Sequence, residues 1–229
     1  MKNLSLLFVF LGLLSLTSCA RWYSVSPDFD RVSRNHQTIA VLPYEVFMLG
    51  RIPRNVTEEQ IIAIEEAEAI AFQVSMHDEM LRSLRNGRYT LTATLISVQE
   101  TNARIQNAGL SIDAMHRMSP KELCQILEVD AVYLGRVEKY RYLTDLESFG
   151  LDIATDLLRI LSRGDLWFIA DDTAQDIFVQ GSIIEGQNGQ ALFSAERGFS
   201  VDWSNPSNQI IRNINSQIAR RIPYRVRNS

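Results

Sequence analysis

The sequence predicts an α/β protein in which a single mixed sheet is flanked by helices, with a C-terminal β-hairpin and a closing helix. Three observations lead to this class. Runs of strand character alternate with runs of helical spacing between residues 38 and 140. Two further strand-like runs flank the dipeptide Asn188-Gly189, a strong signal for a hairpin. A last segment places isoleucines at helical intervals.

The first strand is expected at residues 38–45, TIAVLPYE, an almost continuous apolar run. Thr57 and Gln60 then form a capping box at the start of a long helix. Helical spacing places one set of apolar residues on a common face: Ile64, Ala67, Ala71, Val74 and Leu81. The acidic residues Glu65, Glu66 and Glu68 are expected off that face. Asn86-Gly87 is expected to end this helix.

The middle of the chain continues the alternation. Residues 89–98, YTLTATLISV, alternate with period two and predict a strand. A short helix is expected near 100–107. Ser119-Pro120-Lys121-Glu122 is a second capping box, which opens a helix to about Glu128. Residues 130–140, DAVYLGRVEKY, return as a strand.

The C-terminal part predicts the hairpin and the closing helix. Its strands are expected at 176–185 and 190–199. Asn205-Pro206 starts the helix and Pro223 ends it. The buried face of this helix is expected to hold Ile210, Ile211, Ile214 and Ile218.

The first nineteen residues resemble a bacterial lipoprotein signal. The apolar run 4–16 has about 13 residues, whereas a spanning helix needs about 20. It ends in Leu16-Thr17-Ser18-Cys19, which resembles the lipobox that directs a diacylglycerol to the cysteine thiol. Residues 1–18 are therefore expected to be a signal peptide, and Cys19 the lipidation site. An ordinary signal with a chance cysteine is the alternative.

Cleavage before Cys19 would leave 229 − 18 = 211 residues. Residues 19–37 are expected to form a lipidated tether that holds the domain near the membrane. Ala20, in place of the Asp that retains lipoproteins in the inner membrane, favours the outer membrane facing the periplasm. Trp22 and Tyr23 suit the membrane–water interface, although they could equally pack against the domain.

Composition narrows the function classes. Without Lys2 the chain keeps 23 − 1 = 22 basic and 27 acidic residues, a net charge of −5, which argues against nucleic acid as a partner. Once Cys19 is lipidated, Cys124 has no cysteine to pair with. Because it lies between leucines on a predicted helix, we expect a buried, inert thiol.

Motifs for catalysis or cofactor binding are not found in the sequence. His36, His77 and His116 share no metal-ligand spacing with one another or with a cysteine or carboxylate. There is no nucleophile elbow, phosphate-binding glycine loop or dinucleotide fingerprint. We therefore expect no enzyme, no cofactor and no metal site. An enzyme that uses carboxylates far apart in the sequence is kept as a further alternative.

Residues 141–173 are expected to form a helical insertion that is more apolar than a one-sided surface helix. The insertion either packs on the sheet as an extra helix or contacts a partner, a second copy or a membrane surface. The residues proposed for that contact are Phe149, Leu151, Ile153, Leu157 and Leu158.

The C-terminus is basic, because no acidic residue follows Asp202. Cations suit the end of a helix, and the excess could contact an anionic surface such as lipid headgroups or cell-wall polymer. The arginines concerned are Arg212, Arg220, Arg221, Arg225 and Arg227. Residues 224–229 are expected to be a basic tail beyond the 38–223 domain.

The order of elements over about 37–223 is similar to a group of bacterial envelope lipoproteins and periplasmic domains. The group includes the curli-secretion lipoproteins, the TolB amino-terminal domain and the lipoprotein activators of penicillin-binding proteins. The sharpest match is the helix-to-strand junction at 122–140, where LEVDAVYLGRV resembles the group's pattern LGADAVVxGxV. The resemblance implies a small α/β domain used for protein–protein contact, with no catalytic residues.

These observations together predict a non-enzymatic envelope lipoprotein, anchored to the membrane by acyl chains on Cys19. It is expected to be an accessory or assembly subunit of a transport, secretion or envelope-biogenesis system. The alternative is an oligomeric secretion-channel protomer of the curli-secretion type. The sequence does not identify the envelope partner, and it leaves a homo-oligomer open.

Overall fold

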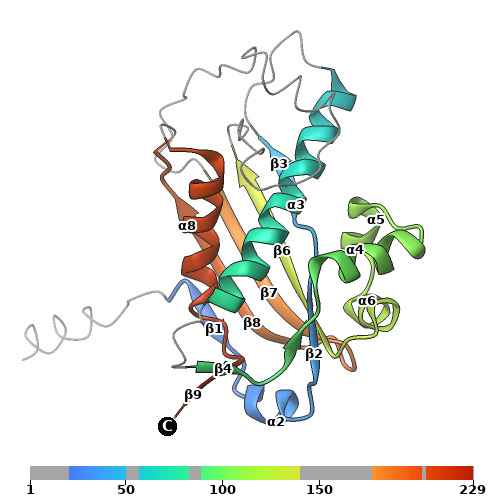
Figure 1. The fold of residues 1–229 in the computed structure, drawn as a ribbon, viewed down its shortest axis with the longest axis vertical. Helices are drawn as coiled ribbons and strands as arrows, with labels where there is room; N and C mark the ends of the chain where they lie inside the picture. The colour runs from blue at the N-terminus through green and yellow to red at the C-terminus, as the bar shows by residue number, and fades with distance from the viewer. Residues whose placement is uncertain (1–20, 50–56, 83–88, 140–176, 203–204, 229) are drawn as a thin grey trace, which may run out of the picture.

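The computed structural model describes residues 21–49, 57–82, 89–139, 177–202 and 205–228 (Figure 1). The described strands form a seven-stranded mixed sheet in the order β1-β8-β7-β6-β2-β5, with β3 paired to β6, and a two-stranded sheet of β4 and β9. The strands of the main sheet are β1 (Tyr23–Val25), β2 (Thr38–Val41), β3 (Glu45–Met48), β5 (Thr94–Leu95), β6 (Ala131–Lys139), β7 (Ile177–Glu185) and β8 (Ala191–Phe199). The strands β1, β8, β7 and β6 pair antiparallel, whereas β2, β3 and β5 join in parallel.

The first face of the sheet is covered by the two long helices α3 (Glu58–Arg82) and α8 (Ser207–Ala219), which lie side by side across it (Figure 1). Alternate strand residues point to this face, so β6 contributes Tyr133 and Val137 and β7 contributes Val179 and Ile183 to one continuous core. This core holds most of the buried apolar surface of the described residues, and hydrophobic burial there stabilises the fold.

The second face is covered only beside β2. The helices α4 (Val98–Asn107), α5 (Ile112–Arg117) and α6 (Pro120–Leu127) form a smaller layer at this position. Ala40, Leu42 and Val132 point away from the main core and pack against this layer. Each of the three helices begins at a serine whose hydroxyl accepts a backbone N–H of the first turn, as sequence signals for helix starts require.

A polar network lies inside the main core. The Tyr44 hydroxyl donates to Asn215 Oδ1 at 3.0 Å and lies 3.2 Å from the Tyr133 hydroxyl, while Asn215 Nδ2 donates to the Phe72 carbonyl at 3.0 Å. All four residues are buried, and the bonds satisfy groups that would otherwise destabilise the core. Complete burial raises the pKa of Tyr44, which therefore stays protonated.

The tyrosine rings need two glycines in the sheet. Gly135 and Gly181 are register partners on β6 and β7. A Cβ at Gly135 would overlap the Tyr44 ring, and a Cβ at Gly181 would overlap the Tyr133 hydroxyl. The glycines therefore let the rings lie flat against the strands, a close approach for which glycine is suited.

The predicted fold class is confirmed, including the hairpin of β7 and β8 and the closing helix. Both capping boxes are present: the Thr57 N–H donates to Gln60 Oε1 at 3.0 Å, and Ser119 and Glu122 cap each other at the start of α6. The predicted isoleucine face of α8 is buried throughout.

The prediction for the acidic face of α3 is wrong at Glu68, which is fully buried. Its Oε2 forms an ion pair with Nζ of Lys139 on β6, and both side chains have no exposed surface. Complete burial lowers the pKa of the Lys139 ammonium, and the nearby Glu65 carboxylate opposes that shift. Leu81, which was expected on the buried face, is 38% exposed.

The strand expected at 89–98 is also wrong as a single element. The chain divides there into β4 (Tyr89–Leu91), which pairs with β9 (Arg225–Arg227), and β5, which joins the main sheet. The basic tail expected at 224–229 belongs to the folded domain in its described part: Tyr224 is fully buried and β9 follows it directly.

The tether expected at 19–37 is not an extended linker in its described part. β1 joins the main sheet as the neighbour of β8, and α2 (Phe29–Ser33) follows, with Phe29 buried against the Tyr224 ring at 5.0 Å. The folded domain thus begins only four residues after Cys19. The predicted signal peptide 1–18, Cys19 and the predicted insertion 141–173 lie outside the described residues.

Candidate functional site

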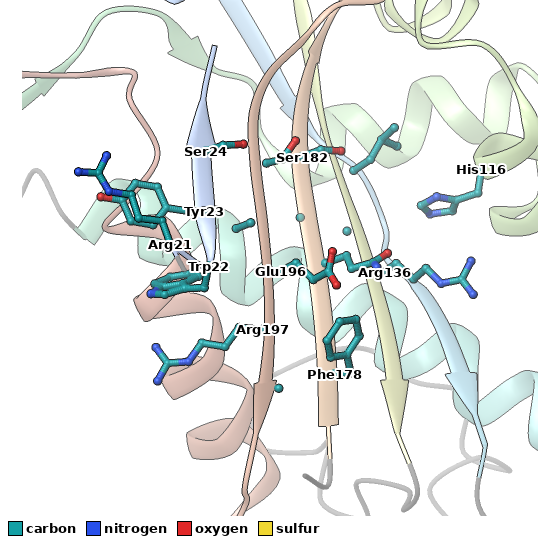
Figure 2. A pocket seen from close by; sticks show the side chains of 17 residues that line it. Arg21, Trp22, Tyr23, Ser24, His116, Arg136, Phe178, Ser182, Glu196 and Arg197 are labelled. Atoms are coloured by element: carbon teal, nitrogen blue, oxygen red, sulfur yellow. The ribbon is translucent and has the colours of Figure 1, made fainter. Parts of the chain in front are cut away.

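A groove of about 710 Å³ lies on the second face of the sheet, between α5 and β1 (Figure 2). It occupies the part of β6, β7 and β8 that the α4–α6 layer leaves uncovered in the described ranges. Period-two alternation puts Phe178, Gln180 and Ser182 on this side of β7, while the residues between them are buried in the main core. The strands that build the core therefore also build the floor of the groove.

The floor is polar and ordered in rows across the strands. Ser182, Ser194 and Ser24 are register partners on β7, β8 and β1 and form a row of hydroxyl side chains. In a neighbouring row, Gln180 lies between Glu196 and Arg136. Side chains directly opposite each other on antiparallel strands lie close together, so each row presents adjacent hydrogen-bonding groups.

The side of the groove near α5 is held by Arg136 and His116. The Arg136 guanidinium bonds Glu45 at 3.3 Å and Glu138 at 2.9 Å, and it lies 4.4 Å from the centroid of the Phe47 ring. His116 Nε2 donates to the Pro43 carbonyl at 2.8 Å. Burial lowers the pKa of His116, so its imidazole is neutral near pH 7 and fixed in one tautomer.

The side of the groove near β1 carries aromatic rings and arginines. The rings of Trp22 and Tyr23 meet edge to face with centroids 5.4 Å apart. The Arg197 guanidinium lies 5.2 Å from the Trp22 ring, and its Nη1 donates to Gln217 Oε1 of α8 at 2.8 Å. Arg221 lies over both rings, 5.9 Å from Trp22 and 5.2 Å from Tyr23. Figure 2 shows Arg21, Trp22 and Tyr23 together at this edge.

The side chains of the groove offer groups for contact with another molecule. In the described part of the chain, no three His, Cys, Asp or Glu side chains gather closely enough to hold a metal ion. The groove's histidine already uses Nε2 on a backbone carbonyl, and its serines face other polar side chains of the sheet floor. What the groove offers is a set of hydrogen-bonding groups, charges and the Phe178 ring for contact with another molecule.

A second cluster of titratable groups, at the start of β6, has a structural role. Burial opposes ionisation of Asp130, but the N–H groups of Gln37 and Thr38, which donate to it at 2.7 and 3.0 Å, lower its pKa overall. His36 Nδ1 lies 2.6 Å from the Tyr224 hydroxyl. Cys124 is buried, as predicted, and burial raises the pKa of its thiol to about 12.

Some of the predicted site residues lie close together in the structure, and others do not. Trp22 and Tyr23 lie with Arg221 at the edge of the sheet, partly packed against the main core. Arg220 and Arg225 lie beside them, because Arg225 donates to the Arg220 carbonyl. Arg227 follows on β9. Arg212 lies apart from this group, because the eight residues from Arg212 to Arg220 span about 12 Å along the axis of α8.

The remaining predicted site residues belong to the part of the chain that the structure does not describe. Cys19 and the insertion residues Phe149, Leu151, Ile153, Leu157 and Leu158 lie outside the described residues. Their proposed roles stay predictions.

Sequence reasoning missed the groove itself. Its signal was present as alternation of polar with apolar residues in β7 and β8, which indicates a sheet with one solvated face. Arg197 was missed because its partners, Trp22 and Gln217, come from distant parts of the chain.

No protein-family model and no curated protein matches the sequence. Among solved structures, the chain is similar to Lipoprotein GNA1162 from Neisseria meningitidis, with 11% identity over 81% of this chain and 96% of that chain, and a TM-score of 0.41. It is also similar to the PelC dodecamer from Paraburkholderia phytofirmans (8% identity, 86% and 91% covered, TM-score 0.41). A third similar structure is the LpoB C-terminal domain from Salmonella enterica (15% identity, 72% and 84% covered, TM-score 0.35). Because these TM-scores lie below 0.5, the function has to be inferred from this chain's own residues.

Proposed function

We propose that this protein is a non-enzymatic, lipid-anchored envelope lipoprotein that acts by protein–protein contact. It would serve as an accessory or assembly subunit of a transport, secretion or envelope-biogenesis system. Acyl chains on Cys19 would hold it in the membrane, at the periplasmic face of the outer membrane. The observation that carries the proposal is a rigid, polar groove on a sheet whose first strand begins four residues after a lipobox cysteine.

The groove supports a contact role because its groups are fixed before any partner arrives. Arg136 is held by two carboxylates and an aromatic ring, and His116 by a backbone carbonyl. Binding to groups that are already ordered costs less conformational entropy. Phe178 and the serine row would give a partner apolar contact and hydrogen bonds on the same surface.

The anchor is supported by the lipobox that ends at Cys19. In the described ranges, no helix is both long and apolar enough to cross a membrane. Two or more acyl chains are needed for stable anchoring, which a diacylglycerol on the cysteine thiol supplies.

Metabolic labelling with an alkyne fatty acid tests the anchor. We expect label on the wild-type protein and recovery in the membrane fraction. The Cys19→Ser variant should lose both, while Cys124→Ser should keep both because that thiol is buried. Wild-type protein without label would contradict the anchor.

Native mass determination in detergent tests the accessory role against the channel alternative. A small assembly of fixed mass that includes a second protein supports an accessory subunit. A large closed ring made of this chain alone would instead favour a secretion-channel protomer.

A further inference from the structure

One end of the molecule gathers arginines and aromatic rings from segments far apart in the sequence. We call it the basic end, and its members are Arg21, Trp22, Tyr23, Tyr89, Arg220, Arg221, Arg225 and Arg227. Figure 1 shows that β1, β4 and β9 lie together at this end, whereas β3 and the start of α3 lie at the opposite end of the long axis.

The basic end is continuous because its members touch in a chain. Arg221 lies over the Trp22 and Tyr23 rings. Its neighbour Arg220 accepts a hydrogen bond from the Arg225 guanidinium at its carbonyl. The Arg225 guanidinium in turn lies 5.3 Å from the Tyr89 ring. These contacts hold arginines from near the C-terminus against aromatic rings of the β1 and β4 segments on one surface.

The positive charge of this surface is not neutralised within the described residues. None of its five arginines forms an ion pair there, and Asp28 on the neighbouring α2 segment is already paired with Arg31 at 3.1 Å. Burial lowers the pKa of Arg225, and repulsion from Arg221 and Arg220 adds to this effect, although Tyr89 opposes it. Mutual repulsion of this kind is relieved when anions approach.

Apolar side chains project at the same end. Val25 on β1 is 39% exposed, Tyr89 on β4 is 36% exposed and Val226 on β9 is 53% exposed. A site for a soluble anion has no use for these side chains. Arginines mixed with exposed aromatic and aliphatic side chains are typical of surfaces that rest in the headgroup region of a bilayer.

The position of the lipobox cysteine indicates which surface the basic end contacts. Tyr23 is the fourth residue after Cys19, so the chain can place at most about 14 Å between the acylated residue and the sheet edge. We propose that the basic end docks on anionic headgroups of the leaflet that holds the acyl chains of Cys19. This proposal rests on the lipid anchor of the proposed function. It orients the molecule with β3 and the start of α3 farthest from the membrane, and it places the β1 side of the groove, with Arg21, Trp22 and Tyr23, next to the headgroups.

Fluorescence of Trp22 in vesicles tests the docking. The acylated protein carries Trp167→Phe and Trp203→Phe, so that Trp22 is its single tryptophan. It is reconstituted in phosphatidylcholine vesicles with and without phosphatidylglycerol, and brominated phosphatidylcholine serves as the quencher. We expect strong quenching only with phosphatidylglycerol, weakened by added salt because the Debye length shortens.

The matched variants reverse charge at arginines other than Arg197 and Arg221, which lie over the Trp22 ring. Arg220→Glu with Arg227→Glu should cut the docked-to-undocked ratio at least about 25-fold, taking about fivefold for each arginine near an anionic surface. Arg117→Glu on α5, an exposed arginine paired with Asp113 and outside the basic end, should leave it unchanged.

The outcomes separate docking from anchoring. Protein that floats with the vesicles while Trp22 stays unquenched would overturn the docking and leave the lipid anchor intact. Equal quenching in both vesicle types would overturn the role of the arginines. Retention on isolated peptidoglycan without quenching would overturn the proposal in favour of a cell-wall contact. Acylated protein that does not float would contradict the anchor, and the docking with it.

Discussion

The two faces of the central sheet are built from the same strands but differ in the burial of their side chains. On the face under α3 and α8, β6 presents Tyr133 and Lys139, both fully buried and bound to partners in the core. On the other face, the same strand presents Arg136 and Glu138, partly exposed and paired with each other. Period-two alternation therefore gives one strand a structural side and a contact side. The comparison teaches that substitutions one residue apart should separate stability from binding.

The largest difference between the faces is expected for their ion pairs. Lys139→Met leaves the Glu68 carboxylate in the core without its cationic partner, which should lower the free energy of unfolding by about 3–5 kcal/mol. Arg136→Met removes partly exposed pairs on the open face and should cost about 1 kcal/mol or less. Urea unfolding at neutral pH measures both. Similar decreases in the free energy of unfolding for the two variants would contradict the assignment of a structural face and a contact face.

A double variant sharpens this result. Replacing both partners, Lys139→Met with Glu68→Leu, should recover much of the loss, since a buried pair can often be replaced by apolar residues of similar volume. No recovery would mean that the loss comes from altered packing and not from the charge left behind.

The next effect compares two neighbours on β7. Gly181→Ala adds a Cβ against the Tyr133 hydroxyl and should lower the free energy of unfolding by about 1–3 kcal/mol. Ser182→Ala, one residue later and on the open face, should change it by about 0.5 kcal/mol or less. Thermal unfolding followed by circular dichroism distinguishes them. An unchanged Gly181→Ala variant would contradict the packing of Tyr133 on the strand.

Two histidines, His36 and His116, make the stability of the fold depend on pH. Burial lowers the pKa of His36 and of His116 below the usual 6.5, so the unfolded chain binds protons first as the pH falls. Stability from this source is fully present above pH 6.5 and declines as the pH falls toward the folded pKa values. His116→Gln should flatten the slope of melting temperature against pH over that window. If the slope of melting temperature against pH is the same in this variant as in the wild type, His116 is not a source of the pH dependence.

The smallest effect on stability is expected in the floor of the groove. Gln180→Ala with Glu196→Ala should change the free energy of unfolding by about 0.5 kcal/mol or less, because both side chains belong to the open face. The same variant should reduce the mass of the native assembly if the groove holds the partner. Loss of stability without loss of assembly would reverse the roles assigned to the faces.

Local signals explain what the sequence could predict. Capping boxes at Thr57 and Ser119, the Asn188-Gly189 turn and the isoleucine spacing of α8 each act within a few residues, and all four agree with the structure. Glu68 was misplaced because its partner Lys139 is far away in the sequence, where helical periodicity carries no information. β1 was missed because three residues are too short to show alternation, and it exists through pairing with β8. The groove depends on which part of the sheet α4–α6 leave uncovered, which is a tertiary property.

Site-specific photo-cross-linking in cells tests the central claim, that the protein works by contact through the open face. A photoreactive phenylalanine analogue replaces Phe178 in the groove or Glu66 on the exposed side of α3, one variant at a time. We predict a discrete cross-linked adduct from position 178 and none from position 66, with the position 178 adduct lost when Cys19→Ser releases the protein from the membrane. An adduct from position 66 alone, or equal adducts from both positions, would contradict the claim.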